Sequence, residues 1–110
     1  MELNIPERIK IIGLLPKEGH YADIKTLRIA REVLSITPEE VKQIDYSEHD
    51  QDGHAMAFFD PAKANALVED IPLDSWTTNK IAAILAKLEK DGKLDEQTMG
   101  LYEKFVIAYQ

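Results

Sequence analysis

Two helix signals that stand close together, over residues 21–34 and 37–45, constrain this chain most. The first segment carries a mainly apolar stripe at helical spacing, in which Ile24, Leu27 and Leu34 are joined by Arg31 and which Ile29, Val33 and Ile36 widen. The second opens on Thr37-Pro38-Glu39-Glu40. Thr37 can cap a helix, proline suits its first turn, and Glu40 completes a capping box. The sequence therefore predicts two helices joined by a tight turn, the outline of a helix-turn-helix.

A further helix is expected before this pair, over residues 5–15. Ile5, Ile9 and Ile12 share one stripe, with Ile11 and Leu14 adjoining it, and Asn4 can cap the first turn. The turn formers that follow, Leu14-Leu15-Pro16-Lys17-Glu18-Gly19, end this helix before the next one begins.

A small β-hairpin is expected after the third helix. Residues 47–53 are polar and predict a loop, whereas residues 54–59 and 67–73 have strand-like composition and are expected to pair. Pro72 restricts the second strand to an edge. A short helix capped by Asp60 is an open alternative to this pairing.

Two more helices are expected in the remaining chain. Asp74 caps the first, Gly92 ends it, and Asp95 opens the second. With 110 residues and 45% apolar residues, the chain is expected to form one domain, residues 1–110. The predicted fold class is α+β and mostly helical, with three N-terminal helices, a small hairpin and two C-terminal helices, which is a winged-helix-like order.

Negative charge is concentrated in the middle of the chain. The formal net charge is −7, and residues 35–75 hold ten Asp and Glu against two lysines, a local net of −8. Such a region repels phosphate backbones and steers association with a basic partner. The leading hypothesis is a small acidic non-enzymatic protein-interaction module. The alternative is that the carboxylates only keep the surface soluble.

A nucleic-acid-binding regulator of winged-helix type is the runner-up hypothesis. A reading helix presents Arg, Lys, Asn or Gln to base edges and phosphates. The third helix begins instead with Glu39 and Glu40, which argue against a nucleic-acid partner for it. The basic residues available for this role are Lys25, Arg28 and Arg31 on the second helix.

A metal site in the polar stretch that follows the third helix is a further hypothesis. Glu48, Asp50, Asp52 and Gly53 match the first, third, fifth and sixth positions of an EF-hand loop, but Phe59 stands where its bidentate glutamate belongs. His49 and His54 could join Asp50 and Asp52 around a divalent ion. A metal-dependent enzyme is therefore the second alternative. We expect no catalytic residue, no metal and no cofactor, because no nucleophile with a base, phosphate loop or cysteine is found.

Three short motifs resemble a group of small uncharacterised proteins of tailed bacteriophages. They are Leu14-Leu15-Pro16-Lys17-Glu18-Gly19, Leu34-Ser35-Ile36-Thr37-Pro38-Glu39-Glu40-Val41 and Leu101-Tyr102-Glu103-Lys104-Phe105. The group has no assigned chemistry, so no functional residue is transferred. The resemblance implies a phage accessory protein that binds a host or phage protein.

The predicted partner-binding residues are the carboxylates of the acidic middle: Glu39, Glu40, Asp45, Glu48, Asp50 and Asp52. The expected partner is a protein with a basic surface, and a homodimer through an exposed apolar helix face is an open alternative. No signal peptide or membrane-spanning run is recognised, so the expected location is the cytoplasm, that of a host bacterium if a phage encodes the chain.

Overall fold

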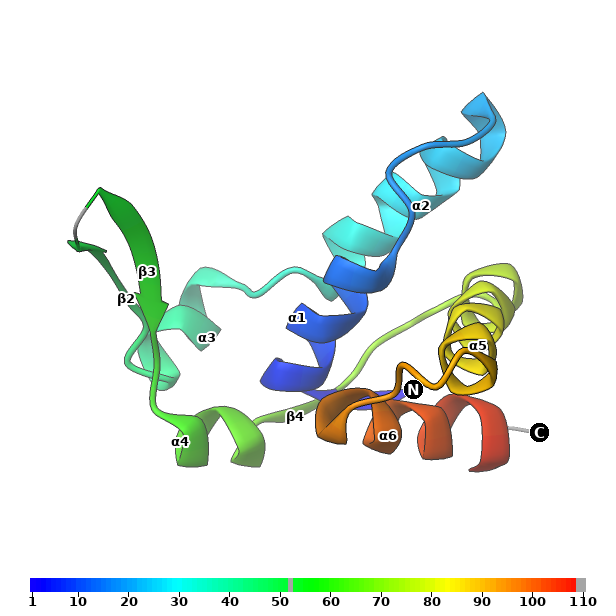
Figure 1. Cartoon of the computed structure of the whole chain (residues 1–110). Helices are drawn as coiled ribbons and strands as arrows, with labels where there is room; N and C mark the ends of the chain where they lie inside the picture. Colours follow the sequence, from blue (N-terminus) through cyan, green and yellow to red (C-terminus); the bar gives the residue numbers. More distant parts are fainter. Residues whose placement is uncertain (52, 109–110) are drawn as a thin grey trace.

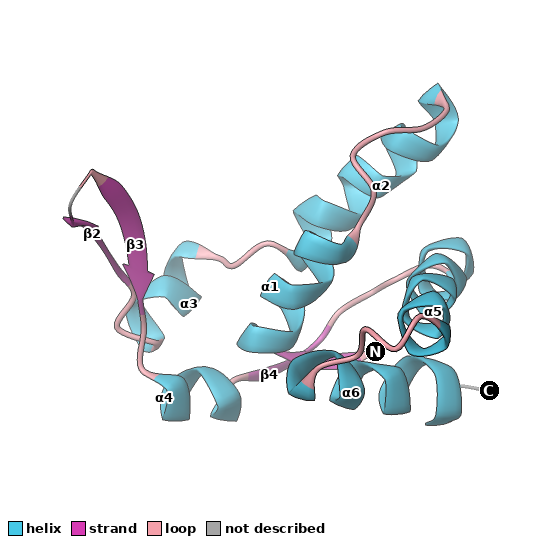
Figure 2. Cartoon of the chain, viewed as in Figure 1, coloured by secondary structure: helices cyan, strands magenta, loops and turns pink. Residues whose placement is uncertain are grey.

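The computed structural model describes residues 1–51 and 53–108, without the side chains of residues 48–51 and 54–57. Helices dominate the described chain, and its strands form two small antiparallel sheets (Figure 1, Figure 2). The mostly helical character with a little antiparallel sheet is therefore confirmed. In order, the elements are β1 (Glu2–Asn4), α1 (Ile5–Leu14), α2 (Tyr21–Leu34), α3 (Pro38–Gln43), β2 (Ser47–Gln51), β3 (His54–Phe58), α4 (Pro61–Ala66), β4 (Val68–Asp70), α5 (Ser75–Lys90), α6 (Glu96–Tyr102) and the π-helix η1 (Glu103–Ala108).

Helix α1 lies between two hydrophobic cores. The main core is shared by α1, α2, α5, α6 and η1, and its fully buried apolar side chains are Leu3, Ile11, Leu27, Leu34, Ile81, Leu85, Leu101 and Phe105. A smaller cluster of Ile5, Ile44 and Ala64 joins α1 to the end of α3 and to α4. Figure 1 shows the consequence: α3, α4 and the β2–β3 hairpin lie on one side of α1, and α5 and α6 lie on the other.

Local capping signals fix where most helices begin. Asn4 and Glu7 form a capping box at α1, and Thr37 and Glu40 form the predicted one at α3. The carboxylates of Asp74 and Asp95 accept backbone N–H bonds at the starts of α5 and α6, as predicted. Their hydrogen bonds with Thr77 and Thr98, respectively, lower the pKa of both carboxyls.

The buried face of α1 differs from the predicted one. Ile9 is 41% exposed, whereas Arg8 and Ile11 are buried. The buried side chains of the helix and its C-cap are Ile5, Arg8, Ile11 and Leu15. Of the predicted stripe, Ile9 is exposed, whereas Ile12 is half-buried against the main core. Charged side chains are rarely buried unless they are paired. Arg8 is paired, as described below.

The prediction for α2 is confirmed in its bounds and corrected on one face. The helix spans Tyr21–Leu34 and buries Leu27, Ala30 and Leu34. Ile29, which was expected to widen the buried stripe, is 53% exposed. Arg31 donates to the Pro16 carbonyl at 2.6 Å. Its guanidinium therefore holds the α1–α2 connection, whereas Lys25 and Arg28, the other two basic residues named for nucleic-acid contact, are exposed.

The predicted hairpin pairing is wrong. Residues 54–58 do form a strand, but β3 pairs with β2, Ser47↔Phe58 through Gln51↔His54, inside the stretch predicted to be a loop. Gly53 has φ +79° and supplies the left-handed backbone of the turn. Composition favoured a loop for residues 47–51, yet a neighbouring strand within a few residues overrides that preference.

The segment between β3 and α5 is also corrected. Asp60 accepts bonds from Ala62 and Lys63 N–H and starts the short helix α4, which was the alternative left open. β4 then pairs antiparallel with β1, Glu2↔Asp70 through Asn4↔Val68. Strand β1 was not predicted, because three residues are too few to show an alternating pattern. Within the described residues, none of the helices combines the length and apolar character needed to span a bilayer.

Candidate functional site

Arg8 ties three helices together at one buried point. Its Nε donates to the Leu34 carbonyl at 3.0 Å, and Nη2 donates to the Ser35 carbonyl. Nη1 and Nη2 donate to the two oxygens of Glu40, at 2.5 and 3.0 Å. The guanidinium of α1 thus bridges the C-terminal end of α2 and the N-terminal end of α3. Both charges suit the helix dipoles, a cation beside carbonyls that end α2 and an anion where α3 begins.

The carboxylate of Glu40 is held ionised in this position. Burial by itself would raise the pKa of Glu40, but hydrogen bonds from Arg8 and Thr37 and the Arg8 charge outweigh it and lower that pKa. One oxygen also accepts the Thr37 backbone N–H at 2.9 Å, and Thr37 Oγ1 accepts the Glu40 N–H at 3.2 Å. The capping box predicted from sequence is therefore also the anionic half of a buried ion pair.

A hollow of about 390 Å³ opens beside this ion pair. Three parts of the chain line it: the end of α2 with the following turn, helix α3, and the strand β4 with Ile71. Its lining residues, in chain order, are Arg8, Glu32, Val33, Ser35, Thr37, Glu39, Glu40, Gln43, Glu69, Asp70 and Ile71. Val33, which is half-buried, and Ile71, which is buried, give the hollow an apolar lining. We call this feature the acidic hollow.

Four exposed carboxylates give the hollow its charge. Arg8 and Glu40 neutralise each other, which leaves Glu32, Glu39, Glu69 and Asp70, all exposed. Asp70 is bound to the Met1 amino group at 2.9 Å. Within the described part of the chain, no cation lies at ion-pair distance from the other three. The hollow therefore concentrates negative charge in a concave surface with some apolar lining, an arrangement that strengthens its field.

The hollow contains two of the six predicted partner-binding residues. Glu39 lies on it with its side chain exposed, whereas Glu40 is 6% exposed and committed to Arg8. Sequence reasoning missed Glu32, Glu69 and Asp70. The charge count placed Glu69 and Asp70 in the acidic middle, but only the fold brings β4 beside α3.

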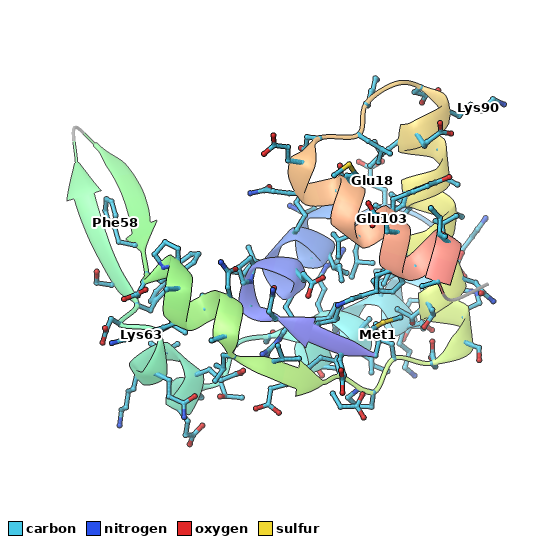
Figure 3. The ribbon with its side chains drawn as sticks, turned by 90° about the horizontal axis from the view of Figure 1, so that it is seen from below. Met1, Glu18, Phe58, Lys63, Lys90 and Glu103 are labelled. Carbon is cyan, nitrogen blue, oxygen red and sulfur yellow. The ribbon has the colours of Figure 1, made fainter. Side chains whose placement is uncertain are left out.

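Of the other four predicted residues, only Asp45 has a described side chain, and it does not line the hollow. Asp45 is exposed, has φ 55°, and accepts a 2.6 Å bond from Lys63 on α4. That hydrogen bond and the Asp45 charge raise the pKa of Lys63. Glu48 and Asp50 are residues of β2 whose side chains lie outside the described part, as does Asp52 altogether. Figure 3 shows Lys63 and Phe58 at the end of the molecule opposite Lys90.

The metal hypothesis rests on residues outside the described side chains. His49, Asp50, Asp52 and His54 all belong to that group. Among the side chains that the structure describes, no group of three His, Asp or Glu is arranged to hold a metal ion. Comparison with known proteins adds no assignment, since no protein-family model, curated protein or solved structure matches the chain.

Proposed function

We propose that this protein is a small non-enzymatic interaction module that binds a basic protein surface through the acidic hollow. One observation supports this most: the exposed carboxylates of Glu32, Glu39 and Glu69 come from three different elements and converge on one concave surface. Carboxylates that serve only solubility need no such convergence. The resemblance to phage proteins extends the proposal to a host or phage partner.

The chemistry of the hollow suits lysine and arginine side chains. Their aliphatic stems can pack against apolar lining such as Val33 while the charged ends meet carboxylates. An arginine can also bind a carboxylate through two parallel hydrogen bonds. The negative field speeds the encounter with such a partner and excludes acidic ones.

Affinity capture from a host lysate tests the proposal with two matched triple variants. The first carries Glu32→Gln, Glu39→Gln and Glu69→Gln and neutralises the hollow. The second carries Glu89→Gln, Glu96→Gln and Glu103→Gln, exposed residues of α5, α6 and η1 that do not line it. Both lose three negative charges, so net charge alone cannot separate them.

We expect the wild type and the second variant to retain the same basic partner, and the first variant to lose it. Equal capture by all three proteins would show that the hollow does not bind the partner and that its carboxylates only keep the surface soluble.

A winged-helix-like nucleic-acid-binding regulator is the alternative that the order of elements supports. Its basic contacts would come from Lys25 and Arg28, because Arg31 is bound to the α1–α2 connection. A mobility-shift assay at low salt separates the two functions, since phosphate binding is strongest there. The interaction-module proposal predicts no retarded band, and retardation abolished by Lys25→Gln with Arg28→Gln would favour the alternative.

The second alternative, a metal-dependent enzyme, makes a different prediction. A divalent ion that binds the folded state but not the unfolded one raises the melting temperature. We expect no shift with calcium, magnesium, manganese or zinc. A shift abolished by His49→Gln with His54→Gln would support the metal site.

A further inference from the structure

The outer face of α2 carries exposed residues along its whole length. Tyr21 is 82% exposed and Ile29 is 53% exposed, values far above those of a core side chain. Lys25, Arg28 and Glu32 are exposed beside them at helical spacing. Figure 1 shows the N-terminal end of α2 projecting beyond α1 and α5. Large apolar side chains and charges therefore share one helix face that the described chain leaves uncovered.

Charge on this face changes sign along the helix. Lys25 and Arg28 lie before Ile29, and Glu32 follows it at the edge of the acidic hollow. Beyond Glu32 the hollow adds Glu39 and Glu69, whose carboxylates have no ion-pair partner within the described residues. The face thus runs from two cations through an exposed isoleucine to a group of anions.

We propose that a second copy of this chain docks on this face, with two α2 helices antiparallel about a two-fold axis near Ile29. A two-fold axis places the same patch on both sides of an interface, so the patch must complement itself. Because its two ends are opposite in charge, this face does so. The axis brings the cations of each copy to the carboxylates of the other and buries one Ile29 against its equivalent.

The helix spacing supports this register. With Ile29 at the axis, Lys25 lies four residues before it and meets the turn around Glu32 of the second copy. Tyr21 lies eight residues before the axis, about 12 Å along the helix at 1.5 Å per residue. That position is beyond the end of the second copy's α2, where the acidic hollow opens. The Tyr21 side chain, which is 82% exposed, therefore reaches the hollow's apolar lining in the dimer.

This inference rests on the proposed function, because it uses the acidic hollow as a binding surface. It also predicts regulation of that surface. The Lys25 and Arg28 side chains of the second copy occupy the carboxylates that a basic partner needs. Self-association and partner binding are then mutually exclusive, and a partner must compete with the dimer.

A charge-swap experiment tests the dimer directly. Variant A carries K25E and R28E, and variant B carries E32K and E39K. Alone, each variant opposes like charges across the axis. Mixed, the new carboxylates of A meet the new lysines of B, while the original lysine and arginine of B meet the original hollow of A. Sedimentation equilibrium at low salt measures the association of the wild type, each variant and the equimolar mixture.

We expect the wild type and the A–B mixture to dimerise at least about tenfold more tightly than either variant alone. Ile29→Ser should weaken the wild-type dimer without altering any charge. A monomeric wild type, or a mixture that associates no better than its components, would overturn the proposal.

Titration with a lysine- and arginine-rich peptide separates this result from the proposed function. Variant A keeps the hollow, so it should bind the peptide more tightly than the wild type, which must first dissociate. Peptide binding by a monomeric wild type would uphold the interaction module and reject the dimer. If the charge-swap mixture dimerises but neither wild type nor variant A binds the peptide, the dimer is upheld and the interaction module is rejected.

Discussion

Arg8 and Glu40 lie 32 residues apart in sequence and share two hydrogen bonds in a buried ion pair. The pair joins α1 to the start of α3, and the remaining Arg8 donors hold the end of α2. The acidic hollow opens directly beside it. The Arg8–Glu40 ion pair therefore positions the elements whose exposed carboxylates form the proposed binding surface.

Replacing Arg8 by Met should destabilise the fold strongly. The substitution leaves Glu40 buried without its cation, and breaking a buried pair from one side costs about 3–5 kcal/mol. Urea unfolding measures the loss. Lys10→Met is the matched control on the same helix, because Lys10 lies 3.7 Å from an exposed Asp95 carboxylate and stabilises the fold little. Similar losses of unfolding free energy in both variants would mean that Arg8 does not hold the three helices together.

The Glu40 contribution should disappear in acid. Its folded pKa is lowered, so its stabilising effect is present above the unfolded pKa of about 4.3 and is lost as pH falls through the folded value. We expect the difference in unfolding free energy between wild type and Glu40→Gln to be constant near neutrality and to shrink below that range. A difference that stays constant through the acid range would show that Glu40 titrates normally.

The burial of Ile11 and the exposure of Ile9 on α1 can be tested by replacing each isoleucine with alanine. Ile11→Ala should cost about 2–5 kcal/mol because Ile11 is fully buried in the main core. Ile9→Ala should change stability by only about 0.5 kcal/mol, as is usual at the surface. Denaturant unfolding of both variants shows which face of the helix is buried. A larger loss of stability in Ile9→Ala than in Ile11→Ala would restore the stripe predicted from sequence.

The Thr37 cap should contribute measurably to α3, a helix of six residues. Thr37→Ala removes the hydroxyl that accepts the Glu40 N–H and should cost about 1 kcal/mol. Thr26→Ala is the control, since the Thr26 hydroxyl donates to the Ala22 carbonyl inside α2 and caps no helix, and alanine favours the helix interior. If both substitutions have the same effect on the urea midpoint, the capping box does not hold α3 in place.

Sequence predicted the elements that depend on neighbouring residues. The bounds of α2 and the caps at Thr37, Asp74 and Asp95 were all correct, because each arises within a few residues. The β1–β4 pair joins residues nearly seventy positions apart and left no local signal. Strand pairing depends on which segments the helices bring together, so it could not be read from composition.

The candidate site was predicted only in its charge. An excess of carboxylates in residues 35–75 indicated an acidic surface, and Glu39 lies on the hollow. Glu40 is buried against Arg8, and Glu32 and Glu69 line the hollow, because α1, α2, α3 and β4 lie close together in the fold. No single stretch of sequence contains that information.

The most direct test of the central claim is an NMR titration of the labelled protein with a lysine- and arginine-rich peptide. Backbone amide shifts report which surface the peptide touches. We expect saturable shifts that cluster at Glu32, Val33, Glu39, Glu69 and Ile71, and that vanish in the Glu32→Gln, Glu39→Gln, Glu69→Gln variant. Small, non-saturating shifts spread over all exposed carboxylates, Glu89, Glu96 and Glu103 included, would contradict it.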